Sequence, residues 1–187
     1  MKVLKTPLEE VLIVEPQVFS DSRGFFMETY HKDRYERNGM DAVFVQDNFS
    51  CSVQGTLRGL HYQFPNAQKK LVQVLKGEVF DVAVDIRKGS PAFGKWTGVI
   101  LSETNRRQLF IPEGFAHGFA VLSSEAIFSY KCSDFYTPHS EKGIVWNDPD
   151  LDIEWPIAAP ILSEKDTKYP CLQDVNPKDL PSYGGVQ

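Results

Sequence analysis

The chain of 187 residues has too few cysteines for a disulfide-stabilised fold and no apolar run long enough to cross a membrane. Its three cysteines are an odd number without a Cys-x-x-Cys pair, which fits a reducing cytoplasm. The first residues hold no apolar core of a secretory leader, so we expect none. Lys and Arg number 20 against 25 Asp and Glu, without a basic stripe, so neither a membrane nor nucleic acid is an expected partner.

Histidine is also scarce, with four residues, and no glycine-rich loop of the dinucleotide-binding kind is present. We therefore expect no nicotinamide cofactor, although a few local cations suffice to bind a small anionic ligand. The hydrophobic share of 42% and the charged share of 24% are ordinary for a globular protein. A chain of this length can build one real core, so we expect a single domain over residues 1–187.

Short runs of aliphatic, aromatic and β-branched residues recur along the chain, separated by glycine and proline turns. The clearest alternation, over residues 80–86, places the large apolar side chains on one face and Asp81 and Asp85 on the other. Only residues 32–38, closed by Gly39, are typical of a helix. This pattern predicts an all-β sandwich or barrel. The expected strands cover residues 11–14, 25–30, 44–52, 56–63, 71–75, 80–86, 96–101, 108–111, 118–122, 127–132 and 144–146.

The last part of the chain differs in composition from the rest. After about Asp148 it is rich in proline and aspartate, and we interpret it as an ordered wrap over the barrel. Residues from about 177 to 187 are expected to form a loose tail, because chain ends are poorly ordered unless something holds them.

Strand alternation determines which polar side chains near the first histidine motif, RGLHYQ at residues 58–63, share a face. It places His61 and Gln63 on one face and Arg58 on the other. Lys69 and Lys70 must likewise face opposite ways, so one of them points inward. A lone strand histidine is more often structural than catalytic, but a histidine beside cations suits a general base near neutral pH.

Four motifs, RGLHYQ, AQKKLV at residues 67–72, PEGFAHGF at 112–119 and SEKD at 163–166, resemble those of one known family. It is the dTDP-4-dehydrorhamnose 3,5-epimerase family of the cupin superfamily, and the resemblance spans about residues 10 to 170. It implies a cupin-like jelly-roll β-barrel with a few short helices. It also implies epimerisation of dTDP-4-dehydro-6-deoxyglucose at C3 and C5 through an enolate, without a cofactor, in dTDP-L-rhamnose biosynthesis.

The resemblance implies a role for each of four catalytic residues. His61 would be the general base, and Asp166 would orient it as the partner in a dyad. Lys70, rather than Lys69, would stabilise the enolate oxygen. Tyr130 would return a proton on the face opposite the base. The competing interpretations are plain packing for Tyr130 and a helix-capping box for Asp166.

The resemblance also implies contacts between the protein and the nucleotide sugar. Arg23 and Arg58 suit the diphosphate, because guanidinium groups bind phosphate oxygens in pairs. Tyr136 would stack on thymine. For His117, a core role with Asp81 or a backbone carbonyl competes with a substrate contact. The expected substrate-binding residues are Arg23, Phe26, Glu28, Gln46, Asp47, Asn48, Arg58, Lys70, His117, Tyr136, Glu141 and Lys165.

We expect no metal ion. Metal-binding cupins typically carry His-x-His, then a Glu, then a later His. Here Gln63 occupies the second position, and lysines stand where a carboxylate would be needed. An ammonium group is not a metal ligand, and His61 and His117 alone are too few for a site.

Two other functions remain as alternatives: a single-centre 3- or 5-epimerase for another deoxysugar, and a non-catalytic cupin that binds sugar nucleotides. The resemblance also implies a homodimer in which N-terminal strands cross to the neighbour, so that Arg23, Phe26 and Glu28 complete the partner's site. One departure from the family is visible at Gln73, where arginine is common. This difference would affect substrate binding or the subunit contacts rather than proton transfer.

Overall fold

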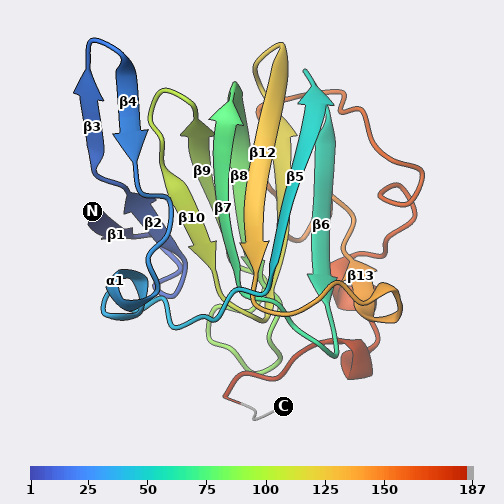
Figure 1. Cartoon of the computed structure of the whole chain (residues 1–187). Helices are drawn as coiled ribbons and strands as arrows, with labels where there is room; N and C mark the ends of the chain where they lie inside the picture. Colours follow the sequence, from blue (N-terminus) through green and yellow to red (C-terminus); the bar gives the residue numbers. More distant parts are fainter. Residues whose placement is uncertain (185–187) are drawn as a thin grey trace.

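Two antiparallel sheets face each other across the core, and a separate hairpin projects beside them (Figure 1). The computed structural model describes residues 1–184. The six-stranded sheet contains, in spatial order, β1 (Lys2–Lys5), β2 (Leu12–Glu15), β10 (Gln108–Ile111), β7 (Lys70–Lys76), β12 (Glu125–Cys132) and β5 (Gln46–Val53). The five-stranded sheet contains β13 (Glu141–Gly143), β6 (Leu57–Gln63), β11 (Phe115–Val121), β8 (Glu78–Asp85) and β9 (Trp96–Ser102). The hairpin pairs β3 (Val18–Asp21) with β4 (Gly24–Met27).

Helical structure within residues 1–184 is limited to one short α-helix, α1 (Lys32–Glu36), and three 3₁₀ turns. The turns are η1 (Pro138–Ser140), η2 (Leu172–Asp174) and η3 (Pro177–Asp179). No helix in this part of the chain is long and apolar enough to cross a membrane. The predicted all-β barrel is thus confirmed, with a C-terminal wrap described below. The expected strand at 144–146 is absent, and its place in the sheet is taken by β13.

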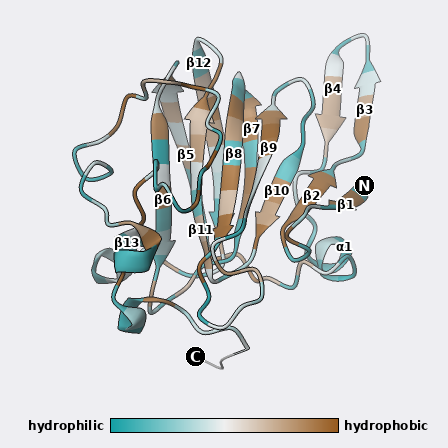
Figure 2. Cartoon of the chain, turned by 180° about the vertical axis from the view of Figure 1, so that it is seen from behind, coloured by the Kyte–Doolittle hydropathy of each residue, from teal (hydrophilic) through white to brown (hydrophobic). Residues whose placement is uncertain are grey.

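The inner faces of the two sheets form the main hydrophobic core. Val72 and Phe128 from the six-stranded sheet pack with Ala83, Leu101 and Val121 from the five-stranded sheet. Figure 2 shows hydrophobic residues along the strands and hydrophilic residues in α1 and many loops. Period-two alternation produces this arrangement, because every second side chain of a strand points to the same face.

Strand β8 has the predicted alternation, and both of its faces are buried. Its larger apolar residues, such as Val82 and Val84, do not face the barrel interior but pack under the C-terminal wrap. Asp81 and Asp85, expected on the face opposite these large apolar residues, are completely buried. Buried carboxylates need partners, and both have them: Asp81 contacts His117, and Asp85 is bound by an arginine. The alternation was predicted correctly, but the sequence did not indicate that both faces are buried.

The C-terminal wrap covers the outer face of the five-stranded sheet. Leu151, Leu172 and Leu180 are buried against this sheet. A hydrogen bond of 2.9 Å from Trp96 Nε1 of β9 to the Leu151 carbonyl attaches the wrap to the sheet. A second, of 2.6 Å from the Leu172 amide to Asp148 Oδ2, joins two parts of the wrap to each other. The predicted wrap is therefore present.

The loose tail predicted from residue 177 is wrong for the part that can be judged. The 3₁₀ turn η3 begins at Pro177, Leu180 is buried, and the Tyr183 ring lies 4.9 Å from the Arg87 guanidinium. Composition misled here, because a polar, proline-rich segment still gains order when one leucine and one tyrosine find sites on the barrel. Residues 185–187 lie outside the described residues.

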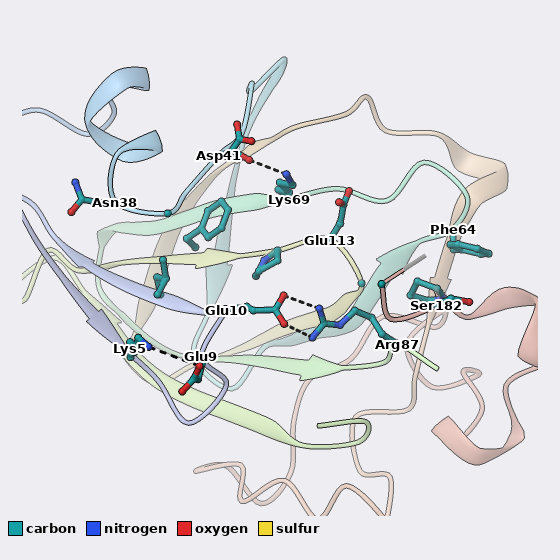
Figure 3. A pocket seen from close by; sticks show the side chains of 17 residues that line it. Lys5, Glu9, Glu10, Asn38, Asp41, Phe64, Lys69, Arg87, Glu113 and Ser182 are labelled. Carbon is teal, nitrogen blue, oxygen red and sulfur yellow. Dashed lines mark hydrogen bonds and ion pairs between the residues drawn. The ribbon is translucent and has the colours of Figure 1, made fainter. Parts of the chain in front are cut away.

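Arg87 joins three distant parts of the chain at one end of the barrel (Figure 3). Its guanidinium binds Asp85 at 2.7 Å and the Glu10 carboxylate through two bonds of 2.7 and 2.9 Å. Its flat faces lie against Phe115 and Tyr183. Burial lowers the pKa of Arg87, but its bonds to Asp85 and Glu10 outweigh this and raise it. The N-terminal loop, β8 and the C-terminal segment are therefore held by one permanently charged side chain.

We predict that Arg87→Ala lowers the free energy of unfolding by about 3–5 kcal/mol, because it leaves the buried Asp85 without its counter-ion. Urea denaturation monitored by fluorescence measures this. Lys168→Ala is the matched control, since it removes an ion pair with Glu164 in which both side chains are largely exposed. It should cost less than about 1 kcal/mol. Equal effects for the two variants would show that the contacts of Arg87 with Asp85 and Glu10 do not stabilise the fold as proposed.

Candidate active site

A cavity of about 320 Å³ opens between the two sheets at one end of the barrel. Its walls come from four strands of the two sheets, β5, β6, β7 and β12, and from β13 with the loops beside it. The cavity gathers many of the polar residues predicted from the sequence. The residues that line it are Gln46, Asn48, His61, Tyr62, Gln63, Gln68, Lys70, Tyr130, Cys132, Tyr136 and Glu141.

A β-bulge on β6 turns two predicted site residues toward the same side. His61 pairs with His117 of β11, and Arg58 pairs with Phe119. The pairing takes three steps along β6 but two along β11, so β6 carries one extra residue. Partners across a ladder share a face, and therefore Arg58 and His61 both face inward. Simple alternation predicted that Arg58 and His61 point to opposite faces of the strand, and this prediction is wrong.

Glycine makes this bulge sterically possible. Gly59 has a φ of +138°, a conformation that L side chains rarely adopt, and a Cβ on it would lie 2.5 Å from the Gly118 Cα. The two strands therefore come together backbone to backbone at the bulge. The Arg58 Nε donates a hydrogen bond of 3.0 Å to Ser52 Oγ of β5, and Arg58 is not among the residues that line the cavity.

His61 is held by a carboxylate from the C-terminal wrap. Its Nε2 lies 2.5 Å from Asp166 Oδ1, and the Asp166 side chain is 3% exposed. Burial raises the pKa of Asp166, but the hydrogen bond and charge of His61 outweigh this and hold it below its ordinary value. An ionised carboxylate favours the tautomer with the proton on Nε2. The Nδ1 lone pair is then left to accept a proton, as in base–orienter pairs.

Lys70 and Lys69 face opposite ways, as predicted. Lys70 lines the cavity, whereas Lys69 lines a different groove and donates to the Asp41 carbonyl at 2.8 Å (Figure 3). Within residues 1–184, the Lys70 ammonium has no hydrogen-bond or ion-pair partner within bonding distance. Burial lowers the pKa of Lys70, while the nearby Cys132, Asp81 and Glu141 act in the opposite direction. The geometry thus offers a cation to an anionic oxygen in the cavity.

Tyr130 approaches the cavity from the sheet opposite to that of His61. It lies on the inner face of β12, whereas His61 lies on β6. Burial raises the pKa of Tyr130, and Cys132 adds to the rise while Arg58 opposes it. The phenol therefore keeps its proton at neutral pH. A base and a potential acid line one cavity from its two walls.

His117 is buried beside His61 and contacts a carboxylate. Its Nε2 lies 3.0 Å from both oxygens of Asp81, and its ring stacks on Phe128 with 6.1 Å between centroids. Burial raises the pKa of Asp81, and His117 and Lys70 oppose the rise. The structure thus contains the core contact with Asp81 that one of the two interpretations predicted. His117 itself does not line the cavity.

A chain of polar contacts forms the cavity mouth. Tyr136 donates from its hydroxyl to Glu141 at 3.0 Å, and the Lys165 ammonium binds the other Glu141 oxygen at 2.6 Å. Burial raises the pKa of Glu141, but Lys165 and Tyr136 outweigh it and lower it. Gln46 accepts from the Tyr136 amide at 2.8 Å and donates to Asn48 at 3.0 Å. These predicted contact residues therefore lie together.

Four predicted contact residues lie elsewhere. Asp47 is on the outer face of β5 and binds Lys131 at 2.9 Å. The other three, Arg23, Phe26 and Glu28, belong to the β3–β4 hairpin or follow it directly, beyond β1 and β2 and at the opposite side of the sheet from β5 (Figure 1). They do not reach the cavity of their own chain.

Sequence reasoning missed several residues at the site. Gln68 and Cys132 line the cavity, and Tyr169 lies against His61. Alternation along β12 would have found Cys132, since it is two residues from Tyr130 and shares its face. Nothing in the sequence indicates that Tyr169 meets His61, because that contact depends on how the wrap crosses the sheet.

No group of three or more His, Cys, Asp or Glu side chains suited to a metal ion occurs among residues 1–184. A second groove, of about 890 Å³, lies on the side of Lys69 and Arg87 (Figure 3). It is larger than the His61 cavity, but none of the predicted site residues lines it. The converging acid, base and cation single out the smaller cavity as the candidate site.

The chain matches a family model described as dTDP-4-dehydrorhamnose 3,5-epimerase over residues 5–174. It is 60% identical over 168 residues to the enzyme of that name from Shigella flexneri, covering 89% of this chain and 93% of the relative. The crystal structure of a dTDP-6-deoxy-D-glucose-3,5-epimerase from Legionella pneumophila, in complex with dTDP-4-keto-L-rhamnose, matches with a TM-score of 0.96 and 53% identity over 97% of this chain and 98% of that chain. A dTDP-4-dehydrorhamnose 3-epimerase from Streptomyces niveus is 38% identical over 190 residues, which cover 100% of this chain and 92% of the relative.

Proposed function

The chain belongs to the dTDP-4-dehydrorhamnose 3,5-epimerase family and has that activity, and we propose that the cavity around His61 carries it out. The substrate is dTDP-4-dehydro-6-deoxyglucose, whose C4 ketone acidifies the hydrogens at C3 and C5. The product is dTDP-4-dehydro-L-rhamnose. The observation that carries this proposal is the placement of His61 and Tyr130 on opposite walls of one cavity.

Each inversion begins when His61 Nδ1 removes the proton from C3 or C5, leaving an enolate with its charge on the C4 oxygen. Asp166 stabilises the imidazolium that forms, because it already accepts the Nε2 proton. The ammonium of Lys70 stabilises the enolate oxygen. Tyr130 then donates its phenol proton to the carbon on the other face. Solvent exchanges the protons of base and acid before the second carbon reacts.

The contacts at the cavity mouth would hold the nucleotide. Tyr136 would stack on thymine, and Gln46 and Asn48 offer amides to its edge. Lys165, bound to Glu141 at the opening, and Arg58 on β6 would supply the cations that a diphosphate needs. His117 would contact the sugar from beside the base, with Asp81 fixing its ring.

The alternatives have weaker support. A single-centre epimerase would need the same base, but the identity to the 3-epimerase relative, 38%, is well below the 60% shared with a 3,5-epimerase. A pure binding protein would need neither an acid nor a base. We also propose that the reaction needs no metal, that the chain is one domain, and that it works in the cytoplasm, where its three free thiols would stay reduced.

We predict that enzyme dialysed against a strong chelator incorporates deuterium at both C3 and C5 of the substrate in deuterated water, as read by NMR. His61→Asn should abolish exchange at both carbons, because no other cavity residue is placed as the base. Label at one carbon only would support the single-centre alternative. Loss of activity on chelation, with recovery on adding zinc, manganese or iron, would contradict the metal-free proposal.

Tyr130→Phe should separate proton exchange from inversion. Without the phenol proton, His61 can still remove a proton, exchange it with solvent and return it to the original face. Deuterium should enter with retained configuration, while inversion falls about 10²–10⁴-fold, as for loss of a general acid. The measurement is NMR of label and configuration together. Wild-type inversion by this variant would make Tyr130 a packing residue, and an equal loss of both would make it a binding or enolate-stabilising residue.

We further propose that the enzyme is a homodimer and that each β3–β4 hairpin completes the partner's cavity. Two features support this. The hairpin is isolated from both sheets and carries exposed aromatic residues, including Phe26, which is 69% exposed. The outer face of β5 exposes Phe49 and Val53, which gives the molecule an unusually apolar surface beside the cavity. Arg23 and Glu28, which lie far from their own cavity, would then reach the neighbour's substrate.

This arrangement predicts complementation between two defective subunits. His61→Asn subunits keep intact hairpins, and Arg23→Ala subunits keep intact cavities, so each homodimer should have little activity. Co-expressed in equal amounts, they should regain about a quarter of the wild-type sites, because half of the dimers are mixed and each has one complete site. Steady-state rates and light scattering measure this. An active monomer, or no recovery in mixed dimers, would contradict the proposal.

A further inference from the structure

Tyr169 contacts the ring of His61 from the C-terminal wrap. The two ring centroids lie 5.8 Å apart, with planes inclined at 68°, so the contact is edge to face. Tyr169 follows Asp166 by three residues in the same loop. One loop therefore supplies both of the groups that touch the imidazole from outside the barrel, a carboxylate at Nε2 and an aromatic ring.

The absence of a side chain at Gly143 creates the space for Tyr169. Gly143 is the partner of His61 across the β13–β6 ladder, so its side chain would stand next to the imidazole. A Cβ there would lie 2.4 Å from Cε2 of Tyr169. The tyrosine ring thus fills the position that a residue on β13 would otherwise occupy.

The loop that carries Tyr169 is fixed at both ends. On the earlier side, the Leu57 amide donates to the Ile161 carbonyl at 3.0 Å. On the later side, the Val145 amide donates to the Pro170 carbonyl at 2.9 Å. Burial raises the pKa of Tyr169 to about 12, so the ring is neutral at any working pH of the enzyme. Its contact with His61 is therefore a van der Waals contact between two rings and not an ionic one.

We propose that Tyr169 is a positioning residue that fixes the plane of the His61 imidazole. The hydrogen bond to Asp166 fixes one atom of the ring, but the ring can still rotate about that point, because the χ2 torsion of histidine is soft. The edge of Tyr169 blocks this rotation. With both contacts in place, Nδ1 keeps a fixed direction toward the substrate carbon. This inference rests on the proposed role of His61 as the base.

The expected consequence is a loss of turnover without a loss of binding. Tyr169 does not line the cavity, so its removal takes away no lining side chain, and Lys165 keeps its own bond of 2.6 Å to Glu141. A base displaced by about 1 Å can cost on the order of 10²-fold in rate. Tyr169→Leu should therefore lower kcat about 10- to 100-fold and leave KM within about threefold of wild type. Tyr169→Phe keeps the ring and should restore kcat.

The control is Tyr183→Leu, which removes a tyrosine of the same wrap that lies on Arg87 rather than on His61. It should leave kcat unchanged even if it lowers the melting temperature. Should Tyr169→Leu fail to fold, Gly143→Ala tests the same point, because its methyl group displaces the Tyr169 ring. Deuterium exchange at C3 and C5 under saturating substrate gives kcat for the proton-removal step.

The outcomes separate this inference from the proposed function. An unchanged kcat for folded Tyr169→Leu would overturn it, and so would a rise in KM alone, which marks a substrate contact. A Phe variant as slow as the Leu variant would also overturn it, since the hydroxyl rather than the ring would matter. If His61→Asn keeps its exchange activity, the proposed base is wrong and the inference loses its premise. A slow Leu variant with a normal Phe variant and a normal Tyr183→Leu control supports it.

Discussion

The contact between His61 and Asp166 joins two segments that are 105 residues apart, and the rest of the structure serves to hold it. His61 is fixed by the sheet, but Asp166 lies in a loop that has no secondary structure of its own beyond turns. It reaches the base only because the wrap is bound to the outer face of the five-stranded sheet. Buried leucines, the bond from the Leu172 amide to Asp148 and the backbone hydrogen bonds at Ile161 and Pro170 hold the wrap there. The wrap thus supplies one of the two residues of the proposed His61–Asp166 dyad.

Burial determines the chemistry of the groups inside the cavity. It raises the pKa of Tyr130 and of Asp81 and lowers that of Lys70, and in each case neighbouring charges modify the shift. The effects have one sense, because low polarity disfavours whichever form is charged. A phenol that keeps its proton can act as an acid, and an ammonium without an internal partner is left for a developing oxyanion. The burial that packs this end of the barrel therefore suits Tyr130 and Lys70 to the roles proposed for them, an acid and an electrostatic partner for proton transfer at carbon.

Much of the barrel could be predicted from the sequence, because short apolar runs separated by turn residues are typical of strands. The family motif predicted that Lys70 rather than Lys69 points inward, and strand alternation required that the two side chains face opposite ways. Three features were out of reach. The bulge that turns Arg58 toward His61 is visible only when β6 and β11 are paired. The burial of Asp85 depends on Arg87 and Glu10, and the place of Tyr169 depends on Gly143. Each arises from contacts between segments distant in sequence, which local patterns do not encode.

The candidate site combines residues of the barrel with residues of the C-terminal wrap, and these two parts differ in local stability. His61, Lys70 and Tyr130 belong to strands of the barrel, whereas Asp166 and Tyr169 belong to the wrap. Loops with few regular hydrogen bonds open locally at a lower free energy than the sheets they cover. When the wrap opens, the base keeps its place on β6 but loses both of its outer contacts at once. Under the proposed mechanism, activity therefore depends on the local stability of the wrap, which can fail while the barrel itself remains folded.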